Sequence, residues 1–246
     1  MLSRRSFLKL SGIAAVSLGS GFGIGKIVSS HANKKSIMLC GFLPNNQEQI
    51  VNTVKSFVDE FLYNETFSVT VRGEDNFSSI LRNQLGNRIN STSNRHLNIR
   101  LTKLTTSLPS DILIKTDDAK IFSPDIDFSA YIQATRNSVL GKDAVYQLNV
   151  ESTENSILDI FNSNNKVAVI ENSKGIVEKI ELNRKATSYK VSGNIGDVVF
   201  NIGNGNAHVH SSTCRHQLCK KGNSAFASGD FIACAPNKVI LRIERS

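Results

Sequence analysis

The chain has 246 residues, which is long enough to bury one large hydrophobic core or two smaller ones. Hydrophobic residues make up 40% of the chain and charged residues 20%, a composition too apolar for a disordered protein. Its formal net charge is +8, but the basic residues form no concentrated run of the kind that nucleic-acid-binding proteins use. Trp is absent and aromatic residues make up 7% of the chain, which argues against a platform for stacking bases or sugars. Composition therefore predicts a folded protein that does not bind nucleic acid.

Residues 1–32 carry the features of an export signal. They contain Ser3-Arg4-Arg5-Ser6-Phe7-Leu8-Lys9, a glycine- and serine-rich apolar stretch over residues 10–28, and Ser30-His31-Ala32. The small residues before position 33 are what a signal peptidase needs. The apolar residues 10–25 are fewer than the ~20 that a membrane-spanning helix needs, and their glycines disfavour a helix. A cleavable signal is therefore favoured over a permanent anchor.

This segment resembles the twin-arginine export signal, with Arg4, Arg5, Phe7 and Leu8 at its fixed positions. The resemblance implies a bacterial or archaeal protein that the twin-arginine translocase exports after folding. It also implies a periplasmic or other extracytoplasmic location, where disulfides persist. Attachment to a membrane is expected only through a signal that stays uncleaved.

Residues 33–160 alternate between strand and helix patterns. Apolar residues recur at steps of three and four in some segments, which predicts helices, and with period two or in short runs in others, which predicts strands. The predicted strands are 35–42, 67–72, 96–104, 111–115 and 145–150, and the predicted helices are 47–63, 77–85 and 130–140. This order predicts an α+β domain with a mostly antiparallel sheet. No family resemblance accompanies it.

Two features of this domain invite a chemical interpretation. Cys40 ends the first predicted strand, but no histidine motif partners it, so a buried small side chain is favoured over a nucleophile. Asp117-Asp118 and Asp125-x-Asp127 lack the periodicity of a calcium loop, so solvated turns are favoured over a cation site. The polar residues 152–165, rich in Ser and Asn, mark the expected domain boundary.

Residues 166–246 show strand patterns alone. Their short apolar segments are 167–170, 176–182, 187–191, 197–202, 207–210, 231–234 and 239–243. Glycine-containing turns separate these segments at close spacing, which predicts a small all-β sandwich or barrel.

The densest group of redox-capable and metal-binding side chains lies in this second domain. Cys214 and Cys219 form a C-x4-C motif around His216, and Cys234 begins a C-x-P-N motif that is followed by a closing strand. With Gly-Asp-Val-Val at 196–199, this order resembles the NusG domain II family. The resemblance implies a β fold. It does not imply a role in transcription, because fold alone does not carry function and an exported chain without a basic face is unsuited to that role.

Cys214-x-His216-x-x-Cys219 is also similar to the first box of Rieske iron–sulfur proteins, in which one Cys and one His bind the cluster and a second Cys forms a disulfide. The second box would have to supply Cys-x-Cys-His, whereas this chain has Cys234-Ala-Pro-Asn237. Because two histidines hold the outer iron of that centre, the missing second His argues against an authentic cluster.

Two interpretations of the three cysteines remain open. Two of them can form a disulfide, which would stabilise a small extracytoplasmic β domain by a few kcal/mol and leave one thiol over. Alternatively, Cys214, Cys219 and Cys234 with His216 or His210 supply the Cys3His set of a structural zinc site. The x4 spacing is wider than the usual x2 spacing, so one disulfide within the trio, without a metal, is the prediction.

The neighbouring polar residues have plainer roles. His208 and His210 alternate with Val209, so both should lie on one, solvent-facing side of a strand. Asn237 follows Pro236 and should shape a turn.

No Ser-His-Asp motif, phosphate-binding loop or nucleotide fingerprint accompanies the cysteines. The sequence therefore predicts a non-catalytic binding or accessory protein of an extracytoplasmic, redox-linked assembly, with a protein partner and no bound cofactor. The alternative is an electron-transfer protein that binds zinc or an iron–sulfur cluster through Cys214, His216, Cys219 and Cys234. A thiol enzyme that uses Cys40 or Cys219 is the third interpretation.

Overall fold

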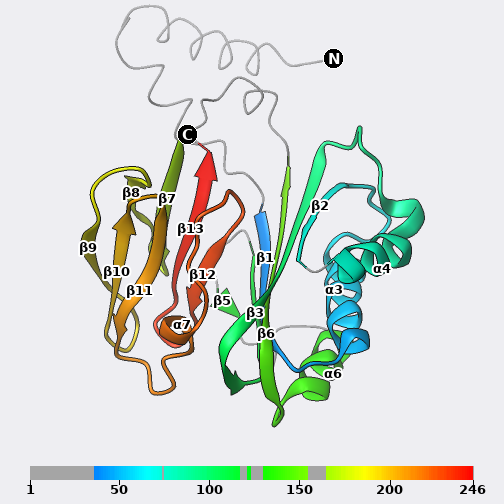
Figure 1. Cartoon of the computed structure of the whole chain (residues 1–246), viewed down its shortest axis with the longest axis horizontal. Coiled ribbons are helices and arrows are strands. Elements are labelled where there is room, and N and C mark those ends of the chain that lie inside the picture. Colours follow the sequence, from blue (N-terminus) through cyan, green and yellow to red (C-terminus); the bar gives the residue numbers. More distant parts are fainter. Residues whose placement is uncertain (1–35, 74, 117–120, 123–129, 155–164, 246) are drawn as a thin grey trace, which may run out of the picture. The chain divides into compact units, whose positions relative to one another are not determined.

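The computed structural model describes residues 36–245 except 74, 117–120, 123–129 and 155–164 (Figure 1). These residues belong to one compact unit of the chain. The export signal over residues 1–32, the pairs Asp117-Asp118 and Asp125-x-Asp127, and most of the polar stretch 152–165 lie outside the described residues. No helix within the described ranges is long and apolar enough to span a membrane.

A six-stranded sheet forms the centre of the first part. Its strand order is β2-β3-β6-β1-β4-β5, and every neighbouring pair is antiparallel except β2 and β3. This arrangement confirms the predicted α+β class. The strands are β1 (Ser36–Leu43), β2 (Ser68–Arg72), β3 (Arg95–Pro109), β4 (Asp111–Lys115), β5 (Ile121–Phe122) and β6 (Asp143–Glu154).

Strands β3 and β6 are longer than the sequence predicts. The apolar alternation of β3 ends at Leu104, and exposed Thr105, Thr106 and Ser107 follow it. The pairing of β3 with β6 nevertheless resumes at Leu108 after a shift in register. Because backbone hydrogen bonds extend the ladder beyond the alternating segment, side-chain pattern alone places the end of the strand too early.

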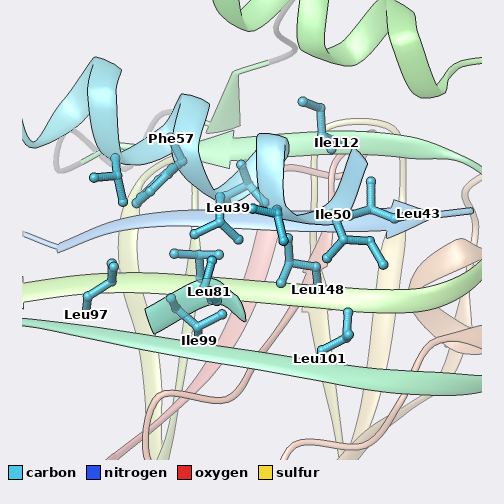
Figure 2. Packing of buried hydrophobic residues seen from close by; sticks show 14 of the residues in the cluster. Leu39, Leu43, Ile50, Phe57, Leu81, Leu97, Ile99, Leu101, Ile112 and Leu148 are labelled. Carbon is cyan, nitrogen blue, oxygen red and sulfur yellow. The ribbon is translucent and has the colours of Figure 1, made fainter. Parts of the chain in front are cut away.

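Three helices cover one face of this sheet (Figure 1). They are α3 (Gln47–Phe61), α4 (Asp75–Leu85) and α6 (Ala130–Val139). A short 3-10 helix, η1 (Gly86–Arg88), follows α4 directly. Asn46 begins α3 by accepting a hydrogen bond from Gln49 N at 3.0 Å, as Asn commonly does at a helix N-terminus. The helices and the sheet share one hydrophobic core, in which Figure 2 labels Leu39, Leu43, Ile50, Phe57, Leu81, Leu97, Ile99, Leu101, Ile112 and Leu148.

The second part is all-β apart from one short helix, as the sequence predicts for its class. Strands β11-β10-β9 form one antiparallel sheet and β12-β13-β7-β8 form another. The elements are β7 (Lys166–Asn172), β8 (Gly175–Glu181), β9 (Thr187–Ser192), β10 (Asp197–Gly203), β11 (Asn206–Ser212), α7 (Leu218–Lys221), β12 (Phe231–Cys234) and β13 (Val239–Arg245). The helix α7 was not predicted, because four residues are too few to show helical periodicity.

The second part packs on the sheet face that the helices leave free. Side chains of a strand alternate between the two faces of a sheet, so Met38, Cys40 and Phe42 of β1 point away from the core that contains Leu39. They pack in a separate apolar cluster with Phe231 and other residues of the second part. Strand β1 is therefore buried on both faces.

Polar contacts reinforce this apolar interface. Lys115 Nζ on β4 lies 2.5 Å from Glu171 Oε2 on β7, and Arg242 Nη2 on β13 lies 2.7 Å from Glu171 Oε1. Asn149 Nδ2 on β6 donates to the carbonyl oxygen of Phe231 at 3.0 Å. The interface therefore includes buried charged groups with specific partners, which fix how β7, β12 and β13 lie against β4 and β6.

Candidate functional site

Three short elements carry the three cysteines of the second part. Cys214 follows the end of β11, Cys219 lies in α7, and Cys234 is the last residue of β12. Between the first two, Gln217 adopts a left-handed backbone conformation with φ of 49° and begins α7. This reversal folds the x4 segment back on itself, and all three thiols join the core of the second part.

The three sulfur atoms converge. All three Sγ atoms lie within 4.8 Å of one another, and Cys214 Sγ is 3.9 Å from Cys219 Sγ. The side chains are buried, with exposed fractions of 4% for Cys214, 6% for Cys219 and 2% for Cys234. The C-x4-C and C-x-P-N motifs, whose cysteines suit either a zinc site or a disulfide, thus bring three thiols to one point.

Ser212 and Asn237 surround this cluster with hydrogen-bonding groups. Ser212 Oγ donates to Cys214 Sγ at 3.3 Å and lies 3.4 Å from Cys234 Sγ. Asn237 Nδ2 lies 3.4 Å from Cys234 Sγ and 3.3 Å from Ser212 Oγ, to both of which it donates. Both residues are buried, and Asn237 Oδ1 is buried without a hydrogen-bond partner among the described residues.

The turn between β9 and β10 holds Asn237 in place. Asn194 N donates to the carbonyl oxygen of Asn237 at 2.9 Å. A Cβ atom at Gly193 would lie 2.4 Å from that same oxygen, so only glycine allows the two backbones to approach this closely. Asn237 lies in the turn between β12 and β13, as the sequence predicts, and its side chain also contacts the sulfur cluster.

Hydrogen bonds change the acidity of two of the thiols in opposite directions. The hydrogen bond from Cys219, supported by Ser212 and by the side chain and backbone N–H of Asn237, lowers the pKa of Cys234 to about 5 against the opposing effect of burial. The same hydrogen bond raises the pKa of Cys219, and burial raises it further. Of the two thiols, Cys234 is therefore the one that loses its proton more easily.

The histidines lie apart from the sulfurs. His216 is exposed, and the three cysteines converge without it. The structure therefore does not gather the set of Cys214, His216, Cys219 and Cys234 that the sequence analysis considered for a metal, although it gathers the three cysteines of that set. His208 and His210 are both exposed on β11, on either side of buried Val209, as predicted.

Cys40 is a separate, buried thiol. It lies in the apolar cluster between the two parts of the chain, and burial, together with the nearby charge of Asp111, raises its pKa to about 12. This environment matches the small buried side chain that the sequence favours, because a neutral buried thiol is a poor nucleophile.

The four cysteines are free thiols in this structure. The separation of 3.9 Å between Cys214 Sγ and Cys219 Sγ is contact between two sulfurs, about twice the length of a disulfide bond. Three thiols at such distances can lose two protons and two electrons to an oxidant and form one disulfide, or they can share a thiophilic metal ion. The disulfide expected from the sequence therefore stays a prediction.

Sequence reasoning missed the role of Ser212 and gave Asn237 only a backbone role. A polar residue two positions before the C-x4-C motif and another directly after the Cys-Ala-Pro tripeptide were the available signals. Such residues are common in turns, so their contact with sulfur emerges only when β11, β12 and the β9–β10 turn are placed together.

Comparison with known proteins bears on the second part of the chain. Residues 152–246 match the NusG domain II family, which confirms the resemblance that the C-x4-C and C-x-P-N motifs indicate. Comparison with functionally curated proteins gives no match.

Three solved structures are similar to portions of the chain. The Lin0431 protein from Listeria innocua is 19% identical, with 34% of this chain and 99% of that chain covered and a TM-score of 0.32. The DUF1312 family protein EF3258 from Enterococcus faecalis is 18% identical, with 33% and 98% covered and a TM-score of 0.31. A DUF1312 family protein from Ruminococcus gnavus is 24% identical, with 32% and 97% covered and a TM-score of 0.29.

Proposed function

We propose that this protein acts outside the cytoplasm as a non-catalytic accessory protein that binds another protein. The observation that carries the proposal is the burial of its thiols. Cys40, Cys214, Cys219 and Cys234 are each no more than 6% exposed. A nucleophile must reach its substrate, so thiols enclosed in this way suit a structural or binding role better than catalysis.

The arrangement of the sheets supports the same role. Helices cover one face of the six-stranded sheet, and the second part covers the other face of β1 through the cluster that contains Met38 and Phe231. Substrate pockets commonly open at the edge or face of a central sheet. Here the two faces of β1 instead serve to hold two layers together as a rigid support.

The second part presents an apolar edge to a partner. Strand β8 ends its four-stranded sheet in the described part of the chain, and Ile176 and Val177 on it are exposed. Asn172 Nδ2 donates to the carbonyl oxygen of Ser192 at 3.3 Å, which brings the β7–β8 turn beside the β9–β10 turn, where Ile195 is also exposed. An extended segment of a partner can pair with such an edge while apolar side chains supply contact area.

Site-specific photocrosslinking in the producing cells tests this proposal. A photoreactive amino acid at position 177 should give one crosslinked species, because this position lies on the apolar edge. The same amino acid at position 63 is the matched control, since Tyr63 is an exposed aromatic residue after α3. Crosslinks of equal yield from both positions, or none from position 177 at native expression, would contradict a binding role for β8.

Cell fractionation gives the compartment in the same experiment. The crosslinked species should be recovered outside the cytoplasm, because the sequence of residues 1–32 resembles an export signal. Recovery from the cytoplasm alone would contradict the extracytoplasmic role while leaving the binding site itself in place.

A further inference from the structure

We propose that Cys214, Cys219 and Cys234 together bind one thiophilic metal ion, either Zn²⁺ or Cu⁺, with the Ser212 hydroxyl as the neighbouring oxygen donor. This inference goes beyond the accessory role, because it concerns the core of the second part and not the β8 edge. It stands on the convergence of three sulfurs and one oxygen from three separate elements.

The spacing of the sulfurs fits a shared ion. Tetrahedral zinc sites have a Zn–S distance of about 2.3 Å, which places neighbouring sulfurs about 3.8 Å apart. Cys214 Sγ and Cys219 Sγ are 3.9 Å apart, and Cys234 Sγ completes a group whose members all lie within 4.8 Å of one another. The three sulfurs therefore already lie close to the spacing that one shared ion requires.

Ser212 stands where a fourth donor would lie. In a tetrahedral site an oxygen ligand and a sulfur ligand are about 3.5 Å apart, given the usual Zn–O and Zn–S distances. Ser212 Oγ is 3.3 Å from Cys214 Sγ and 3.4 Å from Cys234 Sγ. The three thiols and this hydroxyl therefore form a set of four donor atoms, without the exposed His216.

The third sulfur favours a metal over a disulfide alone. A disulfide joins two cysteines and would leave the remaining thiol in the core of the second part without a covalent partner. A metal ion uses all three sulfurs, and soft thiolate ligands select Zn²⁺ and Cu⁺ over the oxygen-preferring ions.

Asn237 provides the outer support that thiolate sites usually have. Its Nδ2 lies 3.4 Å from Cys234 Sγ, to which it donates, and an N–H group that points at a thiolate orients the ligand and stabilises its charge. The close approach of Gly193 to Asn237 holds the backbone from which this side chain extends. On binding, the protonated thiols release their protons to solvent as the sulfurs bond to the ion.

Metal titration of the full chain tests the proposal. Protein kept reduced under anaerobic conditions is titrated with Co²⁺ as a spectroscopic substitute for zinc, and with Cu⁺ against a competing chelator. The expected result is saturation at about one ion per chain, thiolate-to-cobalt charge-transfer bands and proton release. Alkylation of Cys214, Cys219 and Cys234 should also be slower than in the metal-free chain. Elemental analysis of the natively exported protein then decides between zinc and copper.

Variants locate the ion. Cys214→Ser, Cys219→Ser and Cys234→Ser should each weaken binding and reduce the charge-transfer intensity, whereas Cys40→Ala, the matched control, should leave both unchanged. Ser212→Ala should keep the stoichiometry but shift the visible cobalt bands. Unshifted bands would remove Ser212 from the donor set.

Three results would overturn the proposal. The first is an absence of saturable binding by the reduced chain. The second is binding of unchanged affinity and charge-transfer intensity after loss of one of the three cysteines. The third is a disulfide within the trio, with one free thiol and no metal, in the natively exported protein. Circular dichroism of each variant shows whether it is folded, so that lost binding is not confused with unfolding. Because the β8 edge is not altered, failure here leaves the crosslinking result intact.

Discussion

Lys115 Nζ lies 2.5 Å from Glu171 Oε2, and this buried ion pair joins β4 to β7 across the interface between the two parts of the chain. Arg242 Nη2 lies 2.7 Å from the other oxygen of the same carboxylate. Glu171 therefore balances two cations that have little access to water. Removing one member of a buried pair costs more than the pair contributes, because the remaining charge is left without compensation.

Glu171→Gln should destabilise the protein by about 3–5 kcal/mol, since it leaves buried Lys115 without its counter-charge and leaves Arg242 with Glu244 as its remaining partner. Lys115→Met should cost less, because Glu171 keeps its contact with Arg242. Urea unfolding measures both changes. Lys190→Met is the control, because its ion pair with Asp197 is on the surface and exposed pairs contribute little. Equal losses in Lys115→Met and Glu171→Gln would show that Arg242 does not compensate Glu171.

Gly193→Ala should lower stability by about 1–3 kcal/mol, because its methyl group would lie in contact with the backbone of Asn237 and force the turn apart. The displaced Asn237 should also make Cys234 easier to alkylate. Thermal unfolding and thiol labelling check the two effects. Gly141→Ala meets no atom within 4 Å but has φ of 76°, so it should destabilise through backbone strain without changing the labelling of Cys234. A Gly193→Ala variant with normal stability would mean that the turn relaxes freely.

The stability of the protein should fall as pH rises above about 9, owing to Cys40. Its pKa in the folded protein is raised to about 12 from 9.0, so between these values the unfolded chain loses a proton that the folded chain keeps. Unfolding is then favoured by about 1.4 kcal/mol per pH unit. Urea unfolding at several pH values should show this contribution, and Cys40→Ala should make the slope shallower by about 1.4 kcal/mol per pH unit. Some slope should remain, because the raised pKa of Cys219 acts in the same direction. An identical slope in Cys40→Ala and in the unchanged chain would contradict the prediction.

Replacement of Arg4 and Arg5 by Lys should leave the protein in the cytoplasm as an uncleaved precursor. The reason is that the twin-arginine machinery reads paired arginines, and lysine is a point charge that lacks the planar guanidinium group. Immunoblots of cell fractions measure the distribution. Normal export of the double variant would indicate that the general secretory route carries the chain.

Limited proteolysis should cut the chain within residues 155–164, where the sequence is polar and rich in Ser and Asn. The two fragments should then stay together on a sizing column, because the apolar cluster around Phe231 and the pair of Lys115 and Glu171 hold them. Urea at a concentration below that of global unfolding should separate them. Fragments that separate at once in buffer would show that the interface is weak in solution.

The sequence was sufficient for the fold class and the longer elements, because periodicity reports directly on which face of an element is buried. It did not predict the short elements α7 and β5. It located the three cysteines as a candidate site, because their clustering in the chain is unusual. It did not yield Ser212 as a neighbour of the sulfurs, because that contact depends on how β11 meets the turn that contains Asn237. The ion pair of Lys115 with Glu171 could not be predicted from the sequence either. The sequence positions of two charged residues do not indicate whether they pair across distant strands.

The double burial of β1 has a consequence for the newly made chain. Met38, Cys40 and Phe42 are synthesised long before their partner Phe231. Until then the first part can complete the helix-covered core while its other face remains apolar and exposed. A fragment that stops before β12 should therefore associate with itself or recruit chaperones, because β12 and β13 supply side chains that cover this face.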